Sequence, residues 1–180
     1  MNIEPLEVPS ILAFFGTRDS SIPTASLSYN AWATNTTHIR SDYFGSSILS
    51  NETNILTKGT IDKNKNILTG YGQTITNTAS TGKECSYNLF LLACNDMGTA
   101  KYYLKSILYS CKIYDNGTLI RDFIPVKRIS DNEYGLWDKV TKAFYPNSGT
   151  GSFTSGPTVT LSGWHKIKGI WVKTATDTWS

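Results

Sequence analysis

Charged side chains are scarce in this 180-residue chain. They make up 17% of the residues, well below the quarter that is typical of globular proteins. The 17 basic and 14 acidic residues leave a net charge of +3, and the lysines are scattered, so the sequence indicates no nucleic-acid partner. Solubility instead depends on uncharged polar residues, 23 Thr, 19 Ser and 13 Asn, a composition that suits an extracellular or virion protein.

Long apolar runs are absent as well. The longest, residues 89–94, has six residues, whereas a membrane span needs about 20. Residues 1–5 show neither a basic segment nor an apolar one, so we expect no signal peptide and no membrane insertion.

Metal-ligand spacing is also missing. Cys85, Cys94 and Cys111 form no closely spaced pair, and His38 and His165 are far apart, so a zinc site is not indicated. Cys94 and Cys111 lie in apolar stretches, which favours buried, reduced thiols that act as small core residues. We expect no metal ligands and no cofactor.

The usual catalytic patterns are not found. The glycines near residue 150 precede no predicted helix, so they form no phosphate-binding loop. A Ser-His-Asp triad meets only in space and stays open, although neither histidine lies in a nucleophile motif. Retaining glycosidases on β-sandwiches need carboxylates about 5 Å apart on one strand. No two glutamates are four residues apart with an aspartate between them: Glu4, Glu7, Glu52, Glu84 and Glu133.

Aromatic residues are plentiful, at 12% of the chain, which is enough for a folded core. Residues 10–18, 27–33 and 38–44 alternate between apolar and polar side chains, as half-buried strands do. The pattern puts Leu27, Tyr29 and Ala31 on one face. About ten short strands with turn signals every 8–12 residues predict an all-β protein, an antiparallel β-sandwich of the jelly-roll type.

Three later segments extend this prediction. Residues 54–62 and 66–69 form a hairpin around the polar residues 63–65. The apolar run over residues 87–94 indicates one continuous strand covered on both faces. Residues 101–112 fit a helix by the spacing of Leu104, Ile107 and Leu108, but they also alternate as a strand does.

Asp115, Asn116 and Gly117 decide between the two readings. Asn-Gly between apolar runs is the strongest short hairpin signal, because a type I′ turn needs positive φ at both central residues. We therefore predict a hairpin of residues 108–114 and 118–126. Pro125 is expected to end its pairing, since proline donates no hydrogen bond to a sheet.

The C-terminal part predicts smaller units. Residues 134–138 and 142–145 are two short aromatic strands, and residues 146–157 form a loop rich in Gly, Ser and Thr. The tail from residue 159 carries Trp164 and Trp171, so it either docks as a β-ribbon or contacts another chain. The predicted organisation is a sandwich over 1–130, an appended hairpin and loop over 131–157, and a linker or docking ribbon over 158–180.

Aromatic residues on the early strands are the candidate ligand-binding residues. An aromatic ring beside Asn or Asp can stack on a sugar while its neighbours form directed hydrogen bonds. Trp32, Tyr29 and Tyr43 fit this pattern. The alternative is that these rings fill the sandwich core.

The segment YSCKIYDNGTLIRDFIP, residues 109–125, carries a resemblance. Together with GLWD (135–138), KAFY (142–145) and GTGSF (149–153), it resembles the laminin-G-like, concanavalin-A-like jelly-roll modules of phage virion proteins and gut bacterial surface proteins. FGTRD (15–19) and NLFLLA (88–93) are similar to the central strands of those modules. The resemblance covers most of residues 8–157, and the tail from residue 166 resembles linkers of phage tail and fibre proteins.

The resemblance implies fold rather than chemistry, because fold alone does not fix function. Some laminin-G-like domains bind calcium, but no calcium ligands can be placed on this chain. Its matched residues have structural roles: Tyr109, Cys111, Asp115, Asn116, Gly117, Arg121 and Phe123. Such modules normally open with a further strand or two, for which few residues remain here, so we expect a partner chain to cover or complete a sheet edge.

These observations lead to an expected function. The chain is expected to be a non-enzymatic phage virion protein of tail, fibre or head-decorating type, located in the virion. It would assemble with other virion proteins and as a homo-oligomer, and would attach to a host-surface glycan. The alternatives are a bacterial cell-surface carbohydrate-binding adhesin, located outside the cell, and a glycoside hydrolase on the same fold.

Overall fold

A computed structural model describes residues 1–19, 28–79, 82, 84–148 and 151–155, together with the backbone of 159–167 and 170–179. The described residues contain strands and no helix, so none of them forms a helix that could cross a membrane. The chain divides into two units, Met1–Asp122 and Phe123–Ser180. This division falls inside a strand, before the boundary expected at residue 130.

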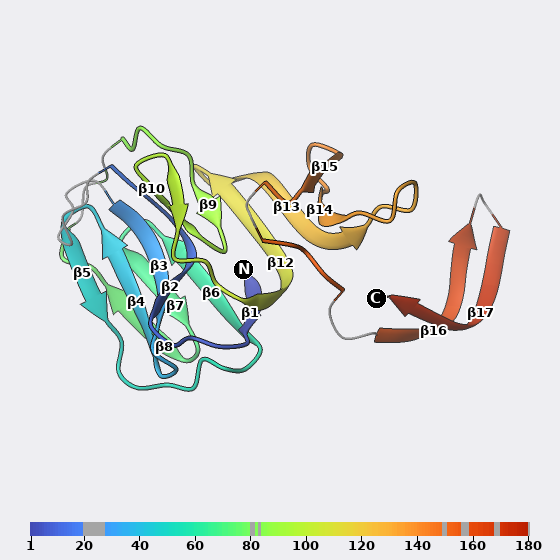
Figure 1. The fold of residues 1–180 in the computed structure, drawn as a ribbon, viewed down its shortest axis with the longest axis horizontal. Coiled ribbons are helices and arrows are strands. Elements are labelled where there is room, and N and C mark those ends of the chain that lie inside the picture. The colour runs from blue at the N-terminus through green and yellow to red at the C-terminus, as the bar shows by residue number, and fades with distance from the viewer. Residues whose placement is uncertain are drawn as a thin grey trace. The chain divides into compact units, whose positions relative to one another are not determined.

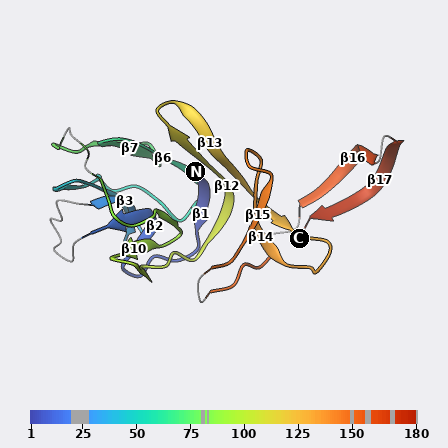
Figure 2. The same cartoon turned by 90° about the horizontal axis from the view of Figure 1, so that it is seen from above.

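Unit 1 is a sandwich of two β-sheets, which confirms the predicted all-β sandwich; the jelly-roll type stays a prediction. Figure 2 shows one layer with β6 and β7 and another with β2 and β3. Within unit 1, the first sheet has the order β12 (Ser106–Asp115), β1 (Asn2–Pro5), β6 (Gly59–Asn64), β7 (Ile67–Gly70) and β8 (Gln73–Thr76). Its pairs within unit 1 are antiparallel.

The second sheet packs against the first (Figure 1). Its order is β11 (Thr99–Lys101), β10 (Cys94–Asp96), β2 (Ile11–Arg18), β3 (Ser28–Thr34), β4 (His38–Tyr43) and β5 (Ser46–Leu49), and β9 (Phe90–Leu91) also pairs with β2. β10 runs parallel to β2, whereas β2, β3, β4 and β5 form an antiparallel meander.

The core lies between the two sheets because alternate residues of each strand point inward. β3 illustrates this: Ala31 and Ala33 face the core, as the period-two pattern predicts, whereas Asn30 and Trp32 lie on the opposite face. β2 carries a bulge between Ala13 and Phe15. The core side chains are Ile3, Val8, Phe14, Phe15, Ala31, Ala33, Ile39, Ile55, Ile61, Leu68, Ile75 and Leu104.

The outer face of the second sheet is also well packed. Gly16 and Asn30 are cross-strand partners, and a Cβ at position 16 would overlap the Asn30 amide oxygen. The missing side chain of Gly16 therefore provides the space in which the fully buried Asn30 lies.

Four hairpins of unit 1 use the same two-residue turn, an X-Gly pair with positive φ at both positions. The predicted pair Asn116-Gly117 has φ values of 46° and 82°, which confirms the type I′ geometry. The same geometry is found at Phe44-Gly45, Tyr71-Gly72 and Met97-Gly98.

Two sequence predictions about this unit are corrected and a third is confirmed. The run over residues 87–94 is not one strand, because Leu92 adopts a left-handed φ of 59° and separates β9 from β10. The β6–β7 turn lies at residues 65–66 rather than 63–65, with Lys65 at a φ of 52°. The choice of a strand over a helix for residues 108–114 is confirmed, and β12 begins slightly earlier, at Ser106.

The expected gap at the start of the sandwich is not found. β1 lies inside the first sheet, where Asn2 and Ile3 pair with β6 and with β12. This short strand lies between β12 and β6, so it supplies an opening strand for which few residues were expected to remain. The expected partner chain stays a prediction.

Unit 2 begins within β13 (Thr118–Lys127), which pairs with β14 (Tyr134–Asp138), and β14 pairs with β15 (Ala143–Pro146). The two predicted aromatic strands are thus confirmed. Pro125 does not end β13, which continues to Lys127, and it is in register with Leu136 of β14. A proline fits a strand where its nitrogen is not needed as a ladder donor.

The last two strands, β16 (Val159–Ile167) and β17 (Ile170–Trp179), form a two-stranded sheet of their own. The predicted ribbon is present as backbone, but the Trp164 and Trp171 side chains lie outside the described residues. Leu27, Gly149 and most of the turn expected over residues 19–23 also lie outside them.

Candidate functional site

The candidate site is a shallow surface pocket of about 360 Å³ in unit 1. It lies between the turn that joins β3 to β4 and the segment, residues 50–58, that joins β5 to β6. Its lining residues are Thr36, Thr37, Glu52, Thr53, Asn54 and Leu56.

Hydrogen bonds hold the two sides of the pocket together. The Thr53 amide donates to the Thr37 carbonyl over 2.7 Å, and the Thr53 hydroxyl donates to the Tyr71 carbonyl over 2.8 Å. Ile55 is fully buried in the core directly below. The pocket is therefore formed before any ligand arrives, which lowers the entropic cost of binding.

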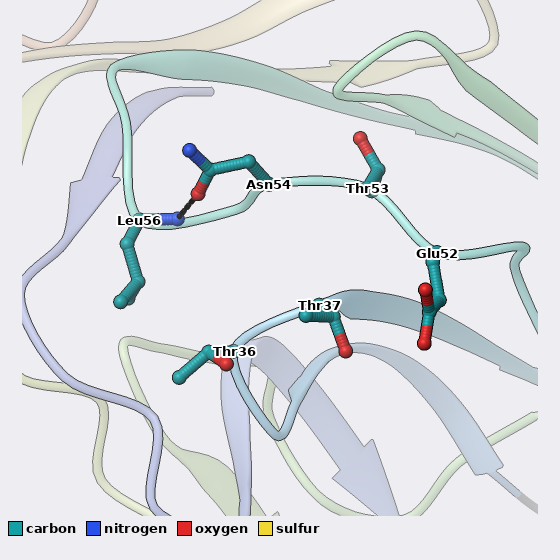
Figure 3. A pocket seen from close by; sticks show the side chains of 6 residues that line it. All are labelled: Thr36, Thr37, Glu52, Thr53, Asn54 and Leu56. Atoms are coloured by element: carbon teal, nitrogen blue, oxygen red, sulfur yellow. Dashed lines mark hydrogen bonds between the residues drawn. The ribbon is translucent and has the colours of Figure 1, made fainter.

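Figure 3 shows how the side chains are directed. The Glu52 side chain extends toward the side on which Thr37 lies, whereas the Asn54 amide lies on the other side of the segment. Asn54 accepts a 3.0 Å hydrogen bond from the Leu56 amide, a local turn that positions Leu56. Thr36, Glu52 and Leu56 are solvent-exposed, with Leu56 at 37%.

The pocket offers groups that can bind a ligand. It contains hydroxyls, one carboxylate and an apolar side chain, but glycoside hydrolysis needs a second carboxylate. Within the described ranges, no three His, Cys, Asp or Glu residues lie close enough to hold a metal ion. Hydroxyl-rich pockets with an apolar wall suit polyhydroxylated ligands, which present both polar edges and apolar ring faces.

The three aromatic residues singled out by sequence do not lie in this pocket. Tyr29 and Tyr43 are cross-strand partners on the core face, with ring centroids 6.1 Å apart. Trp32 lies on the opposite face of the second sheet and is 1% exposed. The structure thus brings the two tyrosines together and separates them from Trp32, and neither Trp32 nor Tyr43 presents an open ring face.

Trp32 is held by a buried polar network. Its indole nitrogen donates to Asp42 over 2.6 Å, and the Tyr102 ring contacts the indole edge to face at 5.3 Å. Asp42 also accepts both hydrogen bonds of the Arg40 guanidinium, each 3.1 Å long. The indole N–H and both of these carboxylate oxygens therefore have hydrogen-bond partners. Trp32 is a buried structural residue on the outer face of the second sheet.

Between the sheets, Lys63 joins the two tyrosines. Its ammonium group donates to Ser41 Oγ over 2.6 Å and lies 5.0 Å and 5.7 Å from the ring centroids of Tyr29 and Tyr43. Burial lowers the pKa of Lys63 to about 8, against the opposing effect of the Asp42 charge. Burial raises the pKa of Tyr29 to about 12.

The remaining sequence candidates are structural. Asp115, Asn116 and Gly117 form an exposed turn. Cys94 and Cys111 are buried free thiols, as predicted, and burial raises their pKa values to about 12 and about 11.

The pocket residues carry no sequence signal. Thr36-Thr37 and residues 52–56 are two unrelated polar stretches in the sequence. The hydrogen bond from the Thr53 amide to the Thr37 carbonyl and the burial of Ile55 bring them together. No protein-family model matches the chain, and neither curated proteins nor solved structures give a match.

Proposed function

We propose that this chain is a non-enzymatic recognition module that binds a glycan in the pocket formed by Thr36, Thr37, Glu52 and Leu56. We place it in a phage virion, as a tail, fibre or head-decorating protein that assembles with other virion proteins and with copies of itself. Host attachment through the glycan is its function.

One observation carries the binding part of this proposal. A preformed pocket with hydroxyls, a carboxylate and an exposed leucine lies at a turn of a rigid sandwich. Saccharides are bound by such combinations of apolar contact and short polar side chains. The virion part is supported by the resemblance of residues 109–125, in which the Asn116-Gly117 turn has the expected geometry.

A paired substitution tests the binding part. Leu56→Ala should weaken binding to host-surface polysaccharide about tenfold, since a well-placed apolar contact contributes on the order of 1–2 kcal/mol. Leu49→Ala is the matched control, because Leu49 is exposed at 48% on β5 and does not line the pocket. Binding is measured on immobilised polysaccharide, and thermal unfolding checks that both variants fold.

Two results would count against the proposal. If no glycan binds, the recognition function is lost; if both leucine variants weaken binding equally, the site lies elsewhere. Mass spectrometry of purified phage particles tests the virion assignment separately, and absence of this chain from them would refute it.

A further inference from the structure

Glu52 sets the charge of the pocket. It is the single charged side chain among the six lining residues. Over the described stretches of the chain, no lysine or arginine forms an ion pair with it. Its carboxylate is exposed and keeps its full capacity to accept hydrogen bonds.

Two neighbouring cations and two of the three threonine hydroxyls of the pocket are engaged. Lys58 follows on the same segment, but its ammonium group lies 4.0 Å from the centroid of the Tyr109 ring. The Arg40 guanidinium is bound by Asp42. The Thr37 hydroxyl lies 2.8 Å from His38 Nδ1, and the Thr53 hydroxyl donates to the backbone. These two cations therefore do not neutralise the negative charge that Glu52 presents to a ligand.

The arrangement of these groups favours hydrogen-bond donors in the ligand. A carboxylate accepts hydrogen bonds and donates none when ionised, and hydrogen bonds to a charged group are about twice as strong as neutral ones. An anionic group close to Glu52 meets repulsion instead. At about 4 Å in a water-like medium, the repulsion between two unit charges corresponds to about fivefold in affinity.

Building on the proposed glycan-binding function, we infer that the pocket selects a non-acidic sugar ring, whose hydroxyl or ammonium hydrogens are donated to Glu52, and rejects acidic sugars. Leu56 provides the apolar contact for the ring, and the exposed Thr36 hydroxyl provides a second polar contact. Charge, rather than pocket shape alone, then discriminates between sugars of the same stereochemistry.

The test compares three methyl glycosides, a hexose, its 2-amino hexose and its hexuronate, in both the gluco and galacto series. Amide shifts of Thr36, Glu52 and Leu56 in NMR titrations give each dissociation constant. For the unmodified chain, the hexuronate should bind up to about fivefold more weakly than the hexose, and the amino sugar at least as tightly as the hexose. Glu52→Gln should bring the ratio between hexose and hexuronate close to one.

A matched variant distinguishes the effect of the charge at Glu52 from the effect of the net charge of the chain. Glu7 is another exposed glutamate, paired with Lys105 at 3.2 Å and not part of the pocket, so Glu7→Gln should leave the ratio unchanged. Equal binding of hexose and hexuronate, or discrimination that survives Glu52→Gln, overturns the inference while glycan binding stands. Failure of all the glycosides and of polysaccharide to bind overturns the proposed function itself.

Discussion

At the scale of single residues, the interior of the sandwich contains a cation that burial disfavours. Lys63 reaches from β6 to Ser41 on β4 and contacts two tyrosine rings. The Ser41 hydroxyl in turn donates to Asn77, whose amide holds the carbonyls of Ser41 and Ser46. This chain of hydrogen bonds links the two sheets through polar groups. The surrounding core links them through apolar contacts instead.

Lys63 should make stability depend on pH. Its pKa is about 8 in the folded chain, against 10.5 as the ordinary value, so between these values the unfolded chain binds more protons and stability rises with pH. Lys63→Met should remove this rise and should be more stable at pH 7, by at most about 3 kcal/mol. Urea unfolding at pH 7 and pH 9.5 measures both effects.

The comparison with Lys63→Met isolates this residue. The buried thiols of Cys94 and Cys111 have raised pKa values and lower the stability at alkaline pH, but they do so equally in both proteins. Lys112→Met, at an exposed position, is the control for loss of charge alone. If the stability of Lys63→Met depends on pH as that of the unmodified chain does, burial of the Lys63 ammonium group does not lower its pKa as assigned.

At the scale of elements, the hairpins show which turns can be predicted. Asn116-Gly117 was predictable because asparagine tolerates positive φ. Phe44, Tyr71 and Met97 adopt the same conformation without belonging to the usual turn residues. Contacts explain two of them: the Phe44 ring contacts Tyr43 at 4.8 Å, and the Tyr71 ring stacks on Phe14 at 6.3 Å.

Met97 is the turn residue whose side chain is 40% exposed and whose backbone has a φ of 52°. Met97→Asn should stabilise the chain by about 1 kcal/mol, because asparagine adopts the left-handed region at lower cost. Asn116→Met, at the equivalent turn position with a φ of 46°, should destabilise it by a similar amount. Chemical unfolding of both variants checks the prediction, and a loss of stability in Met97→Asn would show that its side chain contributes a needed contact.

Sequence patterns predict which face of a strand a residue lies on, but they do not predict which distant segment covers that face. Period two placed Tyr29 and Ala31 on one face of their strand, as the structure has them. It could not show that Trp32 is enclosed by Tyr102 from a distant segment. The pocket was missed for a related reason, since its two sides meet through backbone bonds that carry no composition signal.

At the scale of the whole molecule, unit 1 depends on pairing between distant segments. β1 pairs with β12, about a hundred residues later, and with β6. Such long-range pairings make folding slow, because loops must close before the contacts can stabilise them. The overall two-layer fold was predictable from strand count and turn spacing, but the central place of β1 was not, because four residues carry too weak a pattern.

A substitution at Ile3 should therefore lower the stability of the whole sandwich. Its side chain is fully buried between the sheets, so Ile3→Ala should lower the free energy of unfolding by about 3 kcal/mol. The loss should appear in a single cooperative transition. Leu6→Ala, at a 48% exposed side chain just after β1, should change stability by less than about 0.5 kcal/mol. A small effect of Ile3→Ala in equilibrium denaturation would mean that β1 frays independently.

The close fit of Gly16 and Asn30 has an evolutionary consequence. Because the Asn30 amide occupies the space that any side chain at position 16 would need, an alanine at position 16 requires a smaller residue at position 30. In related chains these two positions should therefore change together, and a lineage that keeps asparagine at one should keep glycine at the other.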